Sequence, residues 1–246
     1  MNELAKGAIR IDDLVVTYGQ RPAVHHLSGV FAPGSLTAVV GPNGAGKSSL
    51  LRAIAGLHPP AQGEVATAGA VALLPQAAAI DRAFPIDCLD VVMFGLWSEC
   101  GAFRAVGRDG RRRAEAALSA VGLDGFSHRP IGSLSAGQLQ RVLFARLLVQ
   151  DAPVMLLDEP FNAIDAATTA DLLRQLALWH GQGRTIVAVL HDLDIVREHF
   201  PQTLLLAREP IAWGATAEVL TAANRLRARG MAEGWDAEAQ PCQQAA

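Results

Sequence analysis

The chain has 246 residues, half of them hydrophobic, and its formal net charge is −3. A chain of this size can form one large domain or one domain with an inserted subdomain, and no run of 18 apolar residues predicts a membrane span. The slightly acidic balance argues against non-specific binding to nucleic acid. Three cysteines (Cys88, Cys100 and Cys242) have no metal-ligand spacing, and residues 1–10 lack the apolar core of a secretory signal. Together these features predict a cytosolic protein with reduced thiols.

Residues 9–18 alternate apolar and polar side chains, which predicts a half-buried strand. Residues 24–31 continue in a strand-like pattern, and Pro33-Gly34 predicts a turn. Short antiparallel strands are therefore expected at the start of the chain. Tyr18 is the only tyrosine. Its ring either packs on the core at the end of its strand or stacks on a nucleotide base.

A phosphate loop follows, because the next segment fits the pattern G-x-x-x-x-G-K-[ST]. Its residues are Gly41, Pro42, Asn43, Gly44, Ala45, Gly46, Lys47, Ser48 and Ser49. An apolar run at 36–40 predicts a buried strand before the loop, and apolar residues at helical spacing predict a helix after it. The glycines let backbone N–H groups turn toward a polyphosphate, and the helix N-terminus adds partial positive charge. We therefore expect Lys47 to reach the β- and γ-phosphates and Ser48 to hold Mg²⁺.

Residues 63–74 predict one or two strands that end at Pro75 and Gln76. From residue 77 the pattern changes. A helix is expected to open at 85–90 and to continue through Trp97, a glycine-bearing loop spans 101–110, and a second helix covers about 111–121. The region from about 77 to 150 is therefore predicted to be a mostly helical insert between two α/β halves.

Two motifs follow at the end of this region. Residues 134–138, here named the signature segment, have the sequence Leu-Ser-Ala-Gly-Gln. Ser135 and Gln138 form a capping box before an amphipathic helix, and an ordinary helix start would show the same pattern. Residues 154–157 are apolar and precede Asp158 and Glu159, which predicts a buried parallel strand with two carboxylates at its end. Because buried carboxylates are costly without a positive partner, we expect Mg²⁺ and a phosphate-bound water there.

The remaining chain predicts a second series of strands and helices. A helix is expected at 166–179, a buried strand at 186–190, strands at 203–206 and 211–213, a short helix at 216–220 and a loose tail at about 232–246. His191 follows the strand at 186–190. Such a histidine is either a helix cap or surface residue, or a functional group at the same sheet edge as Asp158 and Lys47.

In their order along the chain, Tyr18, the phosphate loop, Gln76, the signature segment, Asp158-Glu159 and His191 resemble the ATP-binding cassette of ABC transporters. The resemblance covers the chain from about residue 9 to residue 220. It implies an α/β fold of the P-loop NTPase type. A RecA-like core, an antiparallel β subdomain and a helical subdomain at about 77–150 would form one ATP-binding domain spanning residues 1–246.

The resemblance also implies roles for individual residues. Glu159 resembles the general base that polarises the attacking water. His191 resembles the histidine that contacts the γ-phosphate. The catalytic residues would therefore be Glu159, His191, Gln76 and Lys47. The Mg²⁺ of Mg-ATP would be held, directly or through water, by Ser48, Gln76 and Asp158. ATP would be bound by Tyr18 at the adenine, by the phosphate loop, and from the other subunit by Ser135, Gly137, Gln138 and Asp165.

Two segments depart from the common family pattern. The signature segment usually has the sequence Leu-Ser-Gly-Gly-Gln, whereas Ala136 here replaces the first glycine of the pair. We expect the added methyl group to be tolerated near the helix N-terminus and to affect the ATPase rate. The loop that crosses the dimer has Asn-Ala-Ile-Asp at 162–165 in place of Ser-Ala-Leu-Asp, a form familiar from the metal-importer branch of the family.

Weaker features indicate the branch. Residues 160–165, Phe94-Gly95-Leu96-Trp97 and Trp213-Gly214 are similar to zinc importer ATPases of the AztA type, and manganese and iron(III)-chelate importer subunits are close relatives. The resemblance therefore implies an ATP-hydrolysing subunit that energises import of a divalent metal ion, with zinc in first place. ATP and Mg²⁺ would be its cofactors. The chain shows no His/Cys cluster with ligand spacing, so metal choice is expected to lie in the partners.

The expected partners are membrane permease subunits, a periplasmic or lipid-anchored metal-binding protein, and a second copy of the chain joined head to tail by ATP. Nucleic acid is not expected as a partner. The chain would lie peripherally on the cytoplasmic face of the bacterial inner membrane, and its docking surface would include Ala83, Phe84, Pro85 and Met93. One alternative is a soluble ABC ATPase acting on nucleic acid or ribosomes, but such proteins usually carry two cassettes or a basic surface. Another is a nucleotide-binding regulator without turnover, against which the pair Glu159 and His191 argues.

Overall fold

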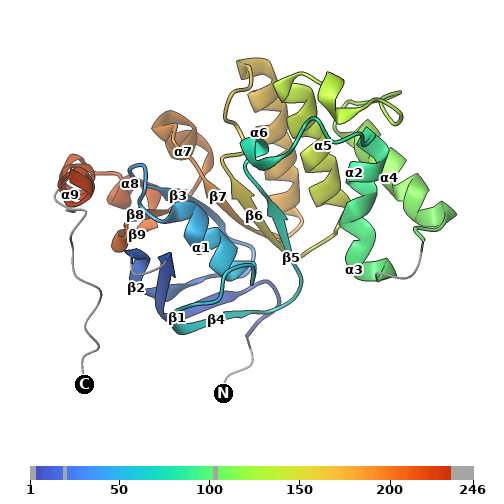
Figure 1. The fold of residues 1–246 in the computed structure, drawn as a ribbon. Helices are drawn as coiled ribbons and strands as arrows, with labels where there is room; N and C mark the ends of the chain where they lie inside the picture. Colours follow the sequence, from blue (N-terminus) through green and yellow to red (C-terminus); the bar gives the residue numbers. More distant parts are fainter. Residues whose placement is uncertain (1–3, 19–20, 102–104, 234–246) are drawn as a thin grey trace.

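The computed structural model describes residues 4–18, 21–101 and 105–233, with the backbone alone at Tyr18, Arg21, Ala232 and Glu233. Two sheets and a separate group of helices make up the molecule (Figure 1). The strands are β1 (Ile9–Tyr18), β2 (Arg21–Phe31), β3 (Leu36–Val40), β4 (Gln62–Thr67), β5 (Val71–Leu74), β6 (Val154–Asp158), β7 (Thr185–Val189), β8 (Gln202–Ala207) and β9 (Glu209–Ala215). The α-helices are α1 (Lys47–Ile54), α2 (Cys88–Met93), α3 (Trp97–Cys100), α4 (Arg108–Ala120), α5 (Ala136–Val149), α6 (Ala166–Gly181), α7 (Leu193–His199), α8 (Thr216–Val219) and α9 (Ala222–Glu233). Short 3₁₀ turns are η1 (Ala77–Ala79), η2 (Phe94–Leu96) and η3 (Ile131–Ser133).

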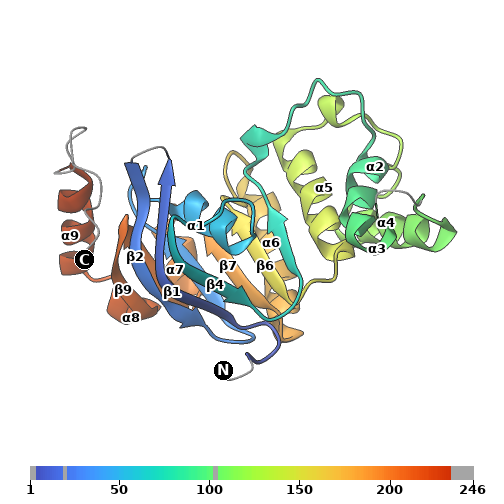
Figure 2. The same cartoon turned by 60° about the horizontal axis from the view of Figure 1, so that its bottom comes forward.

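The larger sheet has the order β5-β6-β7-β3-β8-β9 and is parallel except for β9. The smaller sheet, β2-β1-β4, is antiparallel. Helix α1 lies between the two sheets and contacts both (Figure 2). The predicted α/β fold with an antiparallel part is therefore confirmed. In the parallel sheet, β5, β6, β7 and β3 are neighbours, so the loops after them emerge at one edge.

Alternate residues of the parallel strands pack into two different cores, as strand geometry requires. Met155, Leu157 and Ala188 face a core shared with the helical group. Leu156 and Val189 face a second core, which is closed by α1 and the antiparallel sheet. Burial on both faces explains why residues 154–157 are all apolar.

All described elements between β5 and β6 are helical or irregular, in line with the predicted helical insert (Figure 1). Helices α2, α4 and α5 pack on one another there. On α5, the positions predicted from helical spacing are buried: Leu139, Val142, Leu143 and Leu147. The ring of Phe144 stacks on Trp179 of α6 with centroids 5.7 Å apart, which attaches the helical group to the rest of the molecule.

Two boundaries in the helical group differ from the prediction. The single helix expected through Trp97 is divided into α2, η2 and α3. Gly95 lies at the break, where a Cβ atom would be 2.6 Å from the carbonyl oxygen of Arg146, so close packing rather than helix propensity sets the local shape. Helix α4 begins at Arg108, so the expected 101–110 loop is shorter than predicted.

At the C-terminal side, two helices were not predicted. Asp192 caps α7 by accepting from the backbone N–H groups of Asp194 and Ile195. Thr221 accepts from the backbone N–H of Asn224 at the start of α9. Helix α9 ends at Glu233 and so includes residues 232 and 233, which were predicted to belong to a loose tail; the rest of that predicted tail, residues 234–246, lies outside the described residues. Among the described helices, none is both long and apolar enough to cross a lipid bilayer.

Candidate functional site

The phosphate loop connects β3 to α1, as the sequence predicts. Gly46 has a φ of 89°, and a Cβ atom there would lie 1.9 Å from the carbonyl oxygen of Ala23, so only glycine fits. Lys47 is 6% exposed, and its Nζ donates to the carbonyl oxygens of Gly41 and Pro42, both at 2.9 Å. Burial lowers the pKa of Lys47, while the charges of nearby carboxylates oppose this. The ammonium group is therefore held inside the loop it is expected to serve.

Ser48 and Asp158 meet across 110 residues of sequence, with Ser48 Oγ donating to Asp158 Oδ1 at 2.9 Å. Asp158 is 4% exposed at the end of β6. Burial raises its pKa, and the hydrogen bond from Ser48 acts in the opposite direction. A hydroxyl and a carboxylate are hard oxygen ligands of the kind that Mg²⁺ prefers. The donor set therefore fits a magnesium ion.

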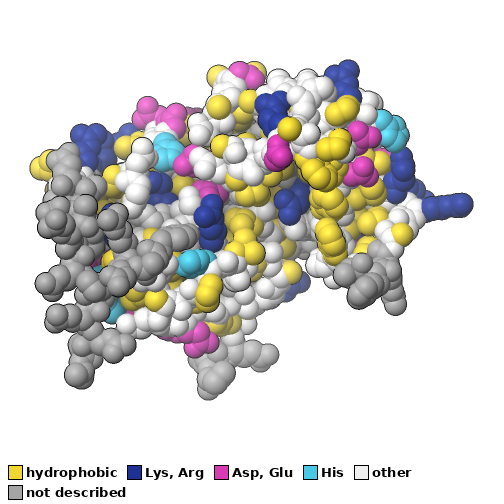
Figure 3. Space-filling model, in the orientation of Figure 1, with side chains coloured by type: hydrophobic (Ala, Val, Ile, Leu, Met, Phe, Trp, Pro, Cys, Tyr) yellow, Lys and Arg dark blue, Asp and Glu magenta, His cyan; other side chains and the backbone are white. Residues whose placement is uncertain are grey.

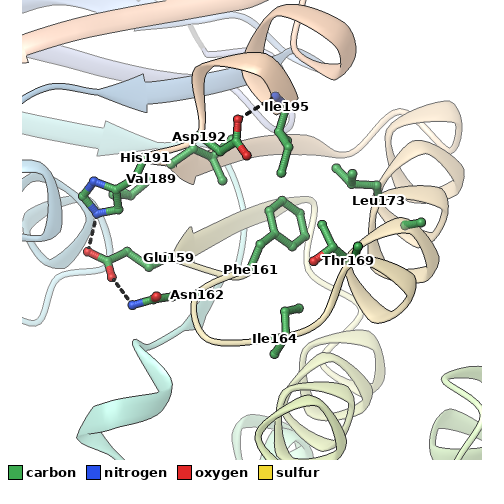
Figure 4. Close-up of a pocket in the computed structure, with 13 residues that line it drawn as sticks. Glu159, Phe161, Asn162, Ile164, Thr169, Leu173, Val189, His191, Asp192 and Ile195 are labelled. Atoms are coloured by element: carbon green, nitrogen blue, oxygen red, sulfur yellow. Dashed lines mark hydrogen bonds and ion pairs between the residues drawn. The ribbon is translucent and has the colours of Figure 1, made fainter.

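Glu159 is the centre of the candidate active site (Figure 4). Its Oε1 lies 2.8 Å from His191 Nε2, and its Oε2 accepts from Asn162 Nδ2 at 3.1 Å. Oε2 also accepts from Gln76 Nε2 at 2.7 Å. Burial favours a higher pKa for Glu159, but His191, Gln76 and Asn162 together hold the pKa below its usual value. The φ of Glu159 is 52°, a left-handed conformation that non-glycine residues adopt rarely and often at functional sites.

Sheet order explains this meeting of distant residues. Gln76 follows β5, Glu159 follows β6 and His191 follows β7, and these three strands are neighbours. The structure therefore brings together the catalytic residues predicted at three strand ends. The amide N–H of Gln76 is directed to Glu159, and its predicted part in holding Mg²⁺ stays a prediction. The hydrogen bond from Asn162 to the Glu159 carboxylate was not predicted from the sequence. The available signal was the position of Asn162, three residues after Glu159.

An apolar pocket of about 540 Å³ opens beside Glu159 and His191 (Figure 4). Its apolar lining includes Phe161, Ile164, Leu173, Val189 and Ile195. The Glu159 side chain is 15% exposed and that of His191 45%. The carboxylate is thus sheltered while the imidazole faces the open side.

The predicted capping box at Ser135 is confirmed. Ser135 Oγ accepts from Gln138 N at 3.2 Å, and Gln138 Oε1 accepts from Ser135 N at 3.0 Å. A Cβ atom on Gly137 would lie 3.2 Å from Thr168 Oγ1. Asp165, which caps α6 through Thr168, therefore lies close to the signature segment.

Within the described part of one chain, no hydrogen bond joins the signature segment to the phosphate loop. Helix α5 belongs to the helical group, whereas α1 lies between the sheets (Figure 1). Ser135 and Ala136 are exposed. The backbone of Tyr18 ends β1, but its side chain lies outside the described residues, so its predicted contact with adenine is not placed.

Comparisons with known proteins agree with this geometry. The family model for ABC transporters matches residues 24–162. The zinc transport system ATP-binding protein TroB of Treponema pallidum is 41% identical over 91% of this chain and 87% of its own length. The manganese transport system ATP-binding protein MntB of Listeria monocytogenes is 38% identical over 87% of this chain and 92% of its own length.

Solved structures give the same result. A metal-chelate type ABC transporter in an inward-facing conformation matches with a TM-score of 0.81 and 31% identity, covering 90% of this chain and 88% of that chain. A dimeric bacterial ABC transporter cassette matches with a TM-score of 0.75 and 25% identity, covering 85% of this chain and 98% of that chain. The phosphate loop, the Glu159 site and these matches together place the chain in the ABC transporter family of ATP-binding proteins.

Proposed function

We propose that this chain is the ATP-hydrolysing subunit of an importer for a divalent metal ion. The observation that carries the proposal is the Glu159 carboxylate, held by His191 and Gln76 at the sheet edge that also presents Lys47 and Ser48. ATPase activity is supported by membership of the family. Transport of metal is supported by the relatives, whose names describe zinc and manganese transport systems.

ATP binding rests on the phosphate loop. Its backbone N–H groups and the N-terminus of α1 favour a polyphosphate, and Lys47 adds a point charge for the β- and γ-phosphates. Ser48 and Asp158 would hold Mg²⁺, with Gln76 as the further predicted ligand, and the ion would neutralise phosphate charge. The adenine would stack on Tyr18.

Hydrolysis rests on Glu159 as general base for the attacking water. Hydrogen bonds from Gln76, Asn162 and His191 restrict the carboxylate to one orientation. Such restriction favours catalysis because the base is oriented before the reaction begins. His191 is exposed enough to contact the γ-phosphate as well.

A second copy would complete each site. Ser135 and Ala136 of the signature segment are exposed, and in the described part of one chain no hydrogen bond joins the segment to the phosphate loop. We therefore propose that it reaches ATP bound to another chain in a head-to-tail dimer. Ser135, Gly137, Gln138 and Asp165 would act in trans. The dimeric cassette among the structural matches supports this arrangement.

Docking to a membrane permease is proposed for a groove of about 460 Å³ on the helical group, here named the docking groove. Its lining includes Ile86, Met93, Phe94 and Trp97. Phe94 is 46% exposed and Trp97 56%. Figure 3 shows hydrophobic side chains gathered over this part of the molecule. Exposed apolar side chains of this size mark interaction surfaces. A permease bound there would place the chain peripherally at the cytoplasmic face of the membrane. A separate metal-binding protein would act on the other side of the membrane.

Zinc is the proposed cargo, as in importers of the AztA type, with manganese or an iron(III) chelate as alternatives. The test is the zinc, manganese and iron content of cells that lack this chain, grown in zinc-chelated medium. We expect low zinc alone, restored by the wild-type chain but not by Glu159→Gln. Low manganese or iron would keep the mechanism and change the cargo, and unchanged metals would contradict the transport function.

The second candidate is a soluble ABC ATPase that acts without a transporter, on nucleic acid or ribosomes. The net charge of −3 argues against it. Co-purification separates the two functions. An affinity-tagged chain that retains a membrane permease after detergent extraction supports the importer, whereas one that retains RNA supports the alternative.

A further inference from the structure

The segment that follows Gln76 also contacts the signature segment. Arg82 Nη2 donates a hydrogen bond to the backbone carbonyl oxygen of Leu134, the residue directly before the helix cap Ser135. The backbones are close as well, because a Cβ atom on Gly132 would lie 2.7 Å from the carbonyl oxygen of Arg82. Two segments 52 residues apart therefore meet at the start of α5.

Backbone hydrogen bonds extend this contact into a short ladder. Ile131 N donates to Ile86 O at 3.0 Å, Cys88 N to Arg129 O at 3.0 Å, and Leu89 N to Ser127 O at 3.1 Å. Asp87 and Pro130 form an antiparallel bridge within it. Residues 82–89 thus lie antiparallel to 127–134, and Arg82 lies at the end of the ladder that is nearest to the signature segment.

The same segment connects the general base to the docking surface. At one end, Gln76 donates to Glu159 at 2.7 Å. Phe84, two residues after Arg82, is 59% exposed, and Ile86 lines the docking groove. A partner that displaces Phe84 would therefore move a segment whose side chains bond to Glu159, through Gln76, and to the signature segment, through Arg82.

The positive charge of Arg82 does not stabilise the helix that begins beside it. The N-terminus of α5 carries partial positive charge, so a neighbouring guanidinium is unfavourable for the isolated helix. The first turn of α5 has no acidic residue to offset it. Arg82 is instead suited to a place where an anion arrives from outside the chain, as ATP on a second copy would.

We propose that Arg82 is a positioning residue that links residues 82–89, which lead to the docking groove, to the signature segment. Through the Leu134 carbonyl, it sets how Ser135 and Gly137 meet the phosphates of ATP bound to the second copy, and it makes this geometry depend on the docked permease. The inference rests on the proposed function, because it requires both a second copy and a membrane partner.

The first test uses the purified chain with Arg82→Ala, Arg82→Gln and Arg82→Lys. Arg112→Ala is the matched control, because Arg112 lies in the same helical group with its side chain 77% exposed. We expect Arg82→Ala to lower kcat about tenfold, with its affinity for a fluorescent ATP analogue unchanged because the phosphate loop is not altered. Arg82→Lys should recover part of kcat, and amide hydrogen exchange should rise at residues 135–138 in Arg82→Ala.

Two results would overturn the positioning role. One is a kcat for Arg82→Ala within about twofold of wild type. The other is a similar loss of thermal stability in all three Arg82 variants, which would indicate a structural role instead.

The second test separates coupling from catalysis in cells. Metal accumulation should fall more in Arg82→Ala than its kcat does, because docking no longer controls the signature segment. A fall only in proportion to kcat would overturn the link to the partner. If the wild-type chain hydrolyses ATP but its deletion changes no metal, the importer proposal fails, and the kcat comparison still decides whether Arg82 positions the signature segment.

Discussion

His191 Nε2 lies 2.8 Å from Glu159 Oε1, although the two residues are 32 positions apart and follow different strands. The imidazole is 45% exposed and the carboxylate 15%, so the pair joins a sheltered base to an accessible histidine. The histidine also contributes to holding the pKa of Glu159 below its usual value, against the effect of burial. An ionised and oriented carboxylate is the state that a general base requires.

Glu159→Gln should bind ATP and hydrolyse it at least about a hundredfold more slowly, because the amide keeps the size of the side chain but accepts no proton. Nucleotide binding and phosphate release, measured on the same preparation, check this. Glu198→Gln is the control, since the Glu198 side chain is 77% exposed. Turnover close to wild type in Glu159→Gln would remove Glu159 from the role of general base.

Lys47→Ala should lose most of its ATP affinity, by about tenfold or more, because the buried point charge expected to reach the phosphates is removed. The chain contains one other lysine, Lys6, which is exposed and serves as the control in Lys6→Ala. Binding of a fluorescent ATP analogue measures the effect. Equal affinity in the two variants would contradict the predicted role of the loop lysine.

Gly46→Ala and Gly44→Ala form a matched pair in the phosphate loop. Both glycines have a left-handed backbone, with φ values of 89° and 75°. A Cβ atom on Gly46 would lie 1.9 Å from the carbonyl oxygen of Ala23, whereas one on Gly44 meets nothing within 4 Å. We expect Gly44→Ala to cost about 1 kcal/mol of folding free energy and Gly46→Ala clearly more, with loss of ATP binding. Urea unfolding measures the free energy of unfolding of both variants. Equal values would show that the backbone near Ala23 moves to accommodate the added methyl group at residue 46.

Ser135→Ala should lower the free energy of unfolding by about 1 kcal/mol, because the capping box at the start of α5 is lost. Ser135→Asp keeps a side-chain acceptor for the N–H of Gln138 and should retain most of that stability. Thermal or urea unfolding distinguishes the two variants. If both are equally stable, the side-chain cap contributes little to the stability of the fold.

Asp171 should contribute to the pH dependence of stability. Hydrogen bonding from Arg141 Nη2, at 2.5 Å, is the main cause that holds the pKa of Asp171 below its ordinary value of 3.8, with Arg174 adding to it. The contribution of Asp171 to the free energy of unfolding is therefore fully present above pH 3.8. It is lost as the pH falls through the lower pKa that Asp171 has in the folded state.

The measurement for Asp171 is unfolding free energy against pH in wild type and Asp171→Asn. We expect a shallower decline below about pH 4 in the variant, because a group that titrates between the two states has been removed. Asp109→Asn is the control, since its ion pair with Arg112 is 77% exposed on both sides. Parallel curves for wild type and Asp171→Asn would contradict the expectation.

Patterns that depend on neighbouring residues were predicted well from the sequence. The capping box at Ser135 and the strand–loop–helix around Lys47 are each encoded within a few positions. Other local signals were missed. Asp192 and Thr221 are ordinary N-cap residues, but the helices that follow them are short or weakly apolar, so α7 and α9 were not predicted. The break of the helix at Gly95 required the position of Arg146, which no local pattern contains.

The sequence by itself determined which chemical groups are present and in what order: the phosphate loop, the two carboxylates after a buried strand, and the histidine after the next one. Only the tertiary structure decided which of them touch. Ser48 meets Asp158 across 110 residues, and Gln76 meets Glu159 across 83, because β5, β6, β7 and β3 are neighbours in the sheet. Strand order arises from packing both faces of the sheet into two cores, and that long-range burial is not contained in any local spacing.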